Sequence, residues 1–164
     1  YSQCRSDECL PMAGRMTPAR LKLWVNWWPP FLFGGIRVLA IADDWRTARV
    51  QLKLRWYNRN YVGTQFGGAL FSMTDPFWMI LVMESLGPDY IVWDKAAEIE
   101  FVTPGRGDVY ADFKVRDEDL AELRLAAAGG EKVLRWFAVD VHAADGSIVA
   151  RVRKQLYVRL KRQR

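Results

Sequence analysis

The sequence predicts an α+β fold, in which a curved antiparallel sheet wraps around one long central helix and an extra helix precedes the sheet. Two observations carry this prediction. Six segments alternate apolar and polar residues with the period of two that is typical of strands with one buried face. Between the second and third of them, the segment from about Gln65 to Leu86 is apolar almost all round, as expected of a helix buried on every side.

The length of 164 residues favours a single domain that is large enough for a sizeable core. We expect residues 1–15, which are polar and irregular, to be disordered or an added leader. The domain is then predicted to span 16–164, with a first helix at about 18–28 and a core at about 35–160.

Composition excludes several classes of protein. Half of the residues are apolar and eight are Trp, which excludes general disorder. The two cysteines, Cys4 and Cys9, are too few for a disulfide framework, and with His142 as the only histidine no thiol metal site is expected. No segment has the roughly 18 uninterrupted apolar residues of a membrane span. We therefore expect a cytoplasmic protein that binds neither a metal ion nor nucleic acid.

The first helix is rich in Trp (Trp24, Trp27 and Trp28) and ends where Pro29-Pro30 interrupts the apolar run. We interpret it as an amphipathic helix that packs on the domain or lines an apolar pocket. A second possibility is an interfacial membrane anchor, which predicts vesicle binding that is lost on deletion of residues 1–30.

The strand segments follow in order and are separated by turn residues. Asp43-Asp44, Pro104-Gly105 and Asp145-Gly146 mark turns, and residues 117–130 are predicted to form a loop or a short helical connector. The expected strands cover residues 36–42, 50–56, 90–103, 109–115, 133–141 and 148–160. In the last strand, apolar residues alternate with basic ones that we interpret as a solvated face, Lys154 among them. We expect Asp94 and Lys95 to form a local ion pair and His142 to be an ordinary strand residue.

The central helix should end at Gly87-Pro88 and kink at Pro76, whose ring removes one intrahelical hydrogen bond. Asp75, directly before Pro76, is a lone acid in an apolar helix, and burying an ionised carboxylate without partners is expensive. We expect it to be partly buried among Met73, Phe77 and Trp78, with the hydroxyl of Ser72 as a possible hydrogen-bond partner.

A polar, glycine-rich turn with Asn60, Gln65, Gly67 and Gly68 leads directly into this helix. Glycines allow close approach of a ligand to the backbone, and the first amides of a helix have no acceptor within it. Together with Asp75, the turn predicts a site that polarises an oxygen beside a base.

The segment N-Y-V-G-T-Q-F-G-G-A-L-F-S-M-T-D, residues 60–75, resembles the N-x-x-G-x-x-H-G-G-x-x-x-x-x-x-D signature of hotdog-fold acyl-CoA thioesterases of the phenylacetyl-CoA and 4-hydroxybenzoyl-CoA type. Over roughly 35–160 the chain is similar to a little-characterised bacterial group of hotdog thioesterases. That group carries G-T-Q-F-G-G, a helical Asp-Pro and the strand Y-I-V-W-D-K, here residues 90–95.

The resemblance implies roles for matching residues. Asn60 matches the pocket asparagine, the amides of Gly67 and Gly68 match the oxyanion site, and Asp75 matches the carboxylate that acts as base or nucleophile. Phe66 stands where the signature has His. The remaining candidate substrate-binding residues are Gln65, Phe66, Ser72 and Met79.

The predicted activity is hydrolysis of an acyl thioester, with coenzyme A or an acyl carrier protein as part of the substrate and no separate cofactor. Gly68 and Asp75 are seven residues apart, or roughly 10 Å along a helix axis. One chain therefore cannot easily bring both residues to one thioester carbon. We expect a homodimer, or a tetramer, in which Gly68 of one chain and Asp75 of another form each site. Because Phe66 replaces His, an acyl-CoA or fatty-acid sensor without catalysis stays open as an alternative.

Overall fold

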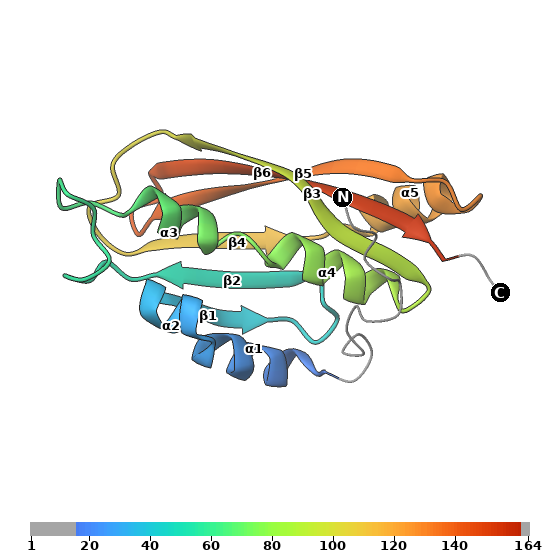
Figure 1. The fold of residues 1–164 in the computed structure, drawn as a ribbon, viewed down its shortest axis with the longest axis horizontal. Helices are drawn as coiled ribbons and strands as arrows, with labels where there is room; N and C mark the ends of the chain where they lie inside the picture. Colours follow the sequence, from blue (N-terminus) through green and yellow to red (C-terminus); the bar gives the residue numbers. More distant parts are fainter. Residues whose placement is uncertain (1–15, 162–164) are drawn as a thin grey trace, which may run out of the picture.

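The computed structural model describes residues 16–161, which form an α+β fold with six strands (Figure 1). In chain order the elements are α1 (Pro18–Trp27), α2 (Pro29–Gly34), β1 (Ile36–Ile41), β2 (Thr47–Leu52), α3 (Gly67–Ser72), α4 (Phe77–Leu86), β3 (Tyr90–Phe101), β4 (Val109–Lys114), α5 (Asp117–Ala127), β5 (Val133–Ala143) and β6 (Ile148–Leu160). Every neighbouring pair of strands is antiparallel, and the order across the sheet is β1-β2-β4-β5-β6-β3. The predicted fold class is confirmed.

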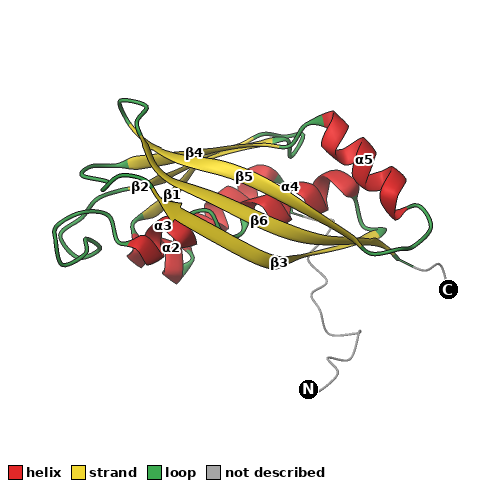
Figure 2. Cartoon of the chain, turned by 90° about the horizontal axis from the view of Figure 1, so that it is seen from above, coloured by secondary structure: helices red, strands yellow, loops and turns green. Residues whose placement is uncertain are grey.

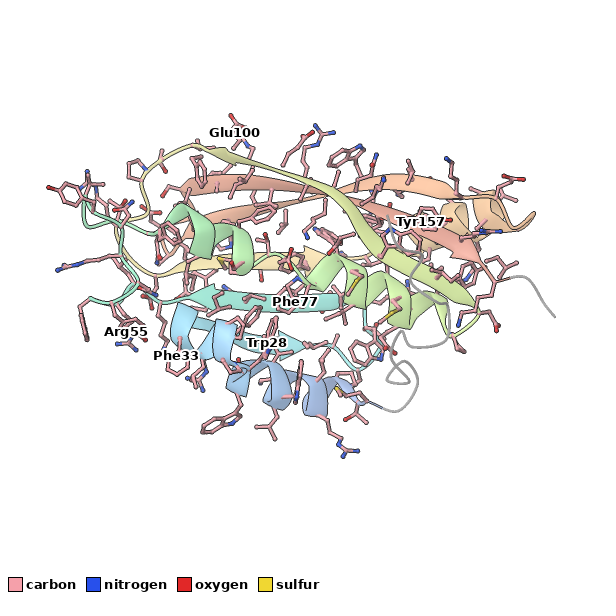
Figure 3. The ribbon with its side chains drawn as sticks, in the orientation of Figure 1. Trp28, Phe33, Arg55, Phe77, Glu100 and Tyr157 are labelled. Atoms are coloured by element: carbon pink, nitrogen blue, oxygen red, sulfur yellow. The ribbon has the colours of Figure 1, made fainter. Side chains whose placement is uncertain are left out.

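The sheet curves over α3 and α4, which lie against its inner face (Figure 2). The core forms where α4 meets the strands: Phe77, Leu81 and Val82 of α4 are buried there. Aromatic rings are central to this packing, with Phe77 and Trp78 both within 5.4 Å of the Phe113 ring on β4, measured between ring centroids. Figure 3 shows Phe77 inside the molecule, between α4 and the sheet.

The predicted kink at Pro76 is a break, which divides the central helix into α3 and α4. Residues 73–76 form tight turns in which the amides of Thr74 and Asp75 donate to the carbonyls of Phe71 and Ser72. Pro76 has no N–H to continue an α-helical ladder, and its own carbonyl accepts from Ile80 to start α4. The break leaves Asp75 between two helices instead of within one.

The second strand is also displaced from its prediction, since β2 covers Thr47–Leu52 and not 50–56. Leu54 and Trp56 continue the alternating pattern in sequence, but Asp108 accepts a hydrogen bond from the Leu54 amide after the strand has ended. Residues 53–66 then form the long loop that leads into α3.

The helix α1 packs on β1 and protects that edge of the sheet. Leu21 and Val25 are buried beneath it, and the Asn26 side chain pairs with the Val38 backbone in both directions, donating to its carbonyl at 3.1 Å and accepting from its amide at 2.7 Å. The prediction that this helix packs on the domain is confirmed. Trp24 and Trp27 point to solvent, with exposed fractions of 52% and 70%.

The segment predicted as a loop or short helix is a regular helix, α5, and it is anchored by Asp119. The Asp119 side chain is buried and binds Arg116 of its own N-terminus at 2.9 Å and Arg135 of β5 at 2.5 Å. The hydrogen bond from the Arg116 side chain holds the pKa of the Asp119 carboxyl below its ordinary value.

Asp119→Ala should lower the free energy of unfolding by about 2 kcal/mol at neutral pH, because two charged hydrogen-bond partners are lost. A carboxyl whose pKa is lowered by folding stabilises the protein above its unfolded value of about 3.9, and this contribution is lost as the pH falls through the folded value. Urea denaturation of both proteins from about pH 7 to pH 2 should therefore show a difference that shrinks toward acid. Asp117→Ala is the control: Asp117 is 87% exposed where it pairs with Arg46, and its loss should change stability by less than about 0.5 kcal/mol.

Candidate functional site

A cavity of about 520 Å³ opens beside the start of α3. One wall is the loop before α3, and the opposite wall is the segment that follows β3. Its lining residues are Asn60, Val62, Thr64, Gln65, Gly67, Leu70 and residues 101–106. Three residues that the sequence marked as site candidates, Asn60, Gln65 and Gly67, therefore meet at one cavity.

The start of α3 has two backbone amides without an acceptor among the residues that the structure describes, and Gly67, the first of the two residues, lines the cavity. Phe66 precedes the helix in an extended conformation, and its carbonyl accepts from the amides of Ala69 and Leu70. Within residues 16–161, the amides of Gly67 and Gly68 donate to no acceptor. Two adjacent free N–H groups beside a cavity can bind an oxygen that develops negative charge.

Aromatic rings lie close over both glycines. A Cβ atom at Gly67 would lie 2.9 Å from Cζ of Phe101, and a Cβ atom at Gly68 would lie 2.4 Å from Cε1 of Phe66. Neither ring is buried, since Phe66 is 54% and Phe101 is 58% exposed. The helix start is thus lined with hydrocarbon and has no polar side chain at position 66.

Asn60 shapes the loop that forms one wall. Its amide nitrogen donates to the Thr64 hydroxyl at 2.9 Å and to the Gln65 carbonyl at 3.2 Å, and its oxygen accepts from the Thr64 amide at 2.9 Å. Both N–H donors of the side chain are therefore used within the turn, as is typical of an asparagine that organises a tight loop.

Gln65 is buried and connects this loop to the sheet. Its amide nitrogen donates to the carbonyls of Leu52 at 3.2 Å and Gly107 at 3.0 Å, and its backbone amide donates to the Gly105 carbonyl at 2.8 Å. These bonds hold both walls of the cavity to the end of β2. The side-chain oxygen Oε1 is buried and has no partner in the described part of the chain.

Gln65→Leu should lower the free energy of unfolding by about 2 kcal/mol, because two carbonyl groups lose their donor in a buried setting. Chemical denaturation measures the loss. Gln155→Leu is the matched control: its side chain is half-buried on β6 and makes no hydrogen bond within residues 16–161, so its effect should stay below about 0.5 kcal/mol. Equal stabilities of the two variants would contradict the role given to Gln65.

Asp75 does not line the cavity; it lies at the break between α3 and α4 and binds a lysine. Its Oδ1 atom is 2.6 Å from Nζ of Lys154, and its side chain is 55% exposed. The predicted burial among Met73, Phe77 and Trp78 is wrong, because the break in the helix turns Asp75 outward while those three residues enter the core.

Asp94 completes this cluster from β3. Its Oδ2 atom is 3.1 Å from the same lysine nitrogen, so the predicted local ion pair with Lys95 is wrong. Burial raises the pKa of the Asp94 carboxyl, and the hydrogen bond and charge of Lys154 counteract part of that increase. The Asp94 Oδ1 atom is buried and without a partner among the described residues.

Lys154 is the residue that sequence reasoning misplaced. It is 2% exposed and lies on the same face of β6 as Val152 and Leu156, not on the solvated face with Arg153. The sequence contained this signal, because alternate residues of a strand face the same side. Lys154 has an even number, as do the apolar residues of the strand (Val152, Leu156, Val158 and Leu160), whereas the neighbouring arginines have odd numbers.

The candidates Ser72 and Met79, and the strand residue His142, have different surroundings. The Ser72 hydroxyl donates to the Gly68 carbonyl at 2.8 Å, so the idea that it binds Asp75 is wrong. Met79 is half-buried on α4 and packs against the core. His142 lies on β5 with Nε2 3.0 Å from Asp112, away from both the cavity and the lysine cluster.

The comparisons with known proteins agree on the fold. A family model described as "Domain of unknown function (DUF4442)" matches residues 19–158. A search of the curated proteins found no match. None of the helices in residues 16–161 is long and apolar enough to cross a membrane.

Solved structures with the same fold come from several bacteria. PA5026 of Pseudomonas aeruginosa, described as a probable thioesterase, is 19% identical with a TM-score of 0.77, over 87% of this chain and 96% of that one. The thioesterase HI1161 of Haemophilus influenzae is 12% identical with a TM-score of 0.65, over 90% and 94%. The PaaI protein of E. coli, from the phenylacetic acid degradation operon, is 18% identical with a TM-score of 0.60, over 85% and 89%. The likeness confirms the hotdog fold.

Proposed function

The chain belongs to the DUF4442 family, and from its fold and site we propose that it hydrolyses an acyl thioester of coenzyme A or of an acyl carrier protein. The observation that carries the proposal is Asp75, a half-exposed carboxylate that is held in place at the break in the central helix. Solved neighbours described as thioesterases support the same reaction.

The reaction needs two groups that act together. The amides of Gly67 and Gly68 would stabilise the oxygen of the thioester carbonyl as it becomes negative. Asp75 would either remove a proton from the attacking water or attack the carbonyl carbon itself, after which water releases the acyl group. In both routes the thiol of the carrier is the leaving group.

Asp75 is absent from the lining of the cavity at Gly67, so one chain does not place its own Asp75 in that cavity. We propose that a second copy supplies its Asp75 to this cavity, within a homodimer. The strand β3 supports such pairing: it is the last strand of the sheet, it is 12 residues long, and its outer edge has no strand neighbour in the part of the chain described. Exposed Phe66, Phe101 and Val102 beside the cavity would be covered by the partner.

Release of free thiol from a panel of acyl-CoAs, short to long and aliphatic to aromatic, tests the proposal. We expect the wild-type protein to turn over at least one member of the panel. If it releases no thiol from any of them, the proposed function is refuted. The cavity volume of about 520 Å³ is in the range of small-molecule sites, so the panel should start with small acyl groups.

One observation favours binding without catalysis. The ring of Phe66 lies over Gly68, where a side chain with a hydrogen-bonding group could have contacted the thioester. An acyl-CoA or fatty-acid sensor would bind the same panel tightly by calorimetry and release no thiol, which separates it from the enzyme.

A further inference from the structure

Lys154 is a fully buried lysine on an otherwise apolar strand face. Its neighbours on that face of β6, Val152 and Leu156, are completely buried. Lysine is almost never buried without a partner, because the ammonium group loses its hydration. The position therefore requires partners, and the fold provides two of them.

These partners come from segments far apart in the sequence. Asp75 lies in the connection between α3 and α4, Asp94 lies on β3, and their carboxylates are 2.6 Å and 3.1 Å from Nζ of Lys154. The centroid of the Phe71 ring on α3 is 5.7 Å from the same nitrogen. We name Asp75, Asp94 and Lys154 the ionic cluster.

The sheet has an irregularity directly after Asp94. In the pairing of β3 with β6, Asp94 is opposite Leu156 and Ala96 is opposite Gln155, so Lys95 is an extra residue in β3. A bulge of this kind changes which side chains face inward and is frequent beside functional sites. Before the bulge Val92 and Asp94 face inward with Val158 and Leu156, and after it Ala97 lies opposite Lys154.

The two carboxylates differ in exposure, and this difference assigns their roles. Asp94 is 27% exposed and Asp75 is 55% exposed. One carboxylate is enough to neutralise the lysine, and the more buried Asp94 does so inside the sheet. Asp75 then uses Oδ1 to bind the ammonium, while its Oδ2 makes no hydrogen bond to residues 16–161.

We propose that Lys154 is a positioning residue for Asp75: anchored by Asp94, its ammonium fixes Oδ1 of Asp75, so that Oδ2 is presented to the reacting water or thioester. This inference rests on the proposed thioesterase function. Because Asp94 binds the same ammonium, Lys154 is held from two sides, and Asp75 keeps its Oδ2 atom to accept a proton or attack a carbonyl.

The test removes the buried charges but leaves Asp75 in place. In Asp94→Leu/Lys154→Met the buried pair is replaced by apolar groups of similar size, a change that proteins often tolerate. We expect a melting temperature within a few degrees of wild type, KM within about twofold, and kcat lower by about tenfold. The control is Arg153→Met, which removes the adjacent cation on the outer face of β6, where it pairs with exposed Glu98, and should leave kcat within about twofold.

A double-mutant cycle separates positioning from a general structural effect. In a protein that already carries Asp75→Asn, the same double replacement should change kcat by less than about twofold, because there is no carboxylate left to position. An equal loss in both backgrounds, or wild-type kcat in the folded double variant, would overturn the inference while the thioesterase function stands. A wild-type protein without thiol release overturns both.

Lys154→Gln provides a second route if the double variant does not fold. Glutamine is similar in length and keeps N–H donors for both carboxylates, but it has no charge. We expect kcat to fall at least about threefold with KM little changed. Full activity in this variant would show that the charge of Lys154 is not needed.

Discussion

Replacing Asp75 by Asn should lower kcat on the preferred acyl thioester by at least about 100-fold, in the range of about 10²–10⁴ for loss of a general base. The amide cannot accept a proton at neutral pH and is a poor nucleophile. Its shape is that of the carboxylate, and Lys154 retains Asp94 as its counter-ion 3.1 Å away. The variant should therefore fold, and its kinetics report on the chemistry.

Steady-state thiol release, with melting temperatures measured beside it, checks this prediction. Asp43→Asn is the control, because Asp43 is an exposed acid in the turn after β1 and should leave kcat unchanged. Unchanged kinetics in Asp75→Asn would refute the catalytic role and leave Asp75 as a partner of a buried lysine.

Replacing Gly67 by Pro should lower kcat by about 10²–10³-fold, the usual loss when one oxyanion donor is removed. Proline has no backbone N–H, and the first helical position tolerates it because that amide has no acceptor within the helix. Phe66 already has φ −71° and ψ 127°, the extended conformation that a residue before proline adopts. The substitution thus deletes the donor and leaves the helix start in its present conformation.

Gly67→Ala is the matched control for this variant. Both substitutions add a Cβ atom 2.9 Å from the Phe101 ring, which is exposed and can move, but only proline removes the amide. Alanine should lower kcat by less than about tenfold. Equal losses in the two variants would show that crowding of Phe101, and not the lost donor, is responsible.

The two inactive variants also test the shared site. If each site takes Gly67 from one chain and Asp75 from the other, a mixed dimer of Gly67→Pro and Asp75→Asn contains one doubly altered site and one intact site. Random pairing in equal amounts should then restore about a quarter of the wild-type activity. No recovery in an isolated mixed dimer would place both groups in one chain.

The site was predictable from sequence only where it is local. The turn of residues 60–68 folds through neighbours a few positions apart, such as Asn60 with Thr64, and its glycines were visible as turn signals. The sequence predicted a kink at Pro76. The helix is interrupted there instead, because residues 73–76 form tight turns. Helix α5 was left open as loop or helix, and it was decided by Arg135 of β5, which binds Asp119 across the chain.

Sequence by itself determined the order of the strands, the α+β class and the glycine-rich start of α3, because periodicity and turn chemistry act over a few residues. Only the tertiary structure decided what Asp75 binds. The fold brings Asp75 and Asp94, which are 79 and 60 residues from Lys154 in the sequence, to the same ammonium group, and the pairing of β3 with β6 places Asp94 opposite Leu156. Local sequence patterns do not predict these contacts, because the contacts depend on strand register. They also depend on the burial of an ammonium group between segments that are far apart in the sequence.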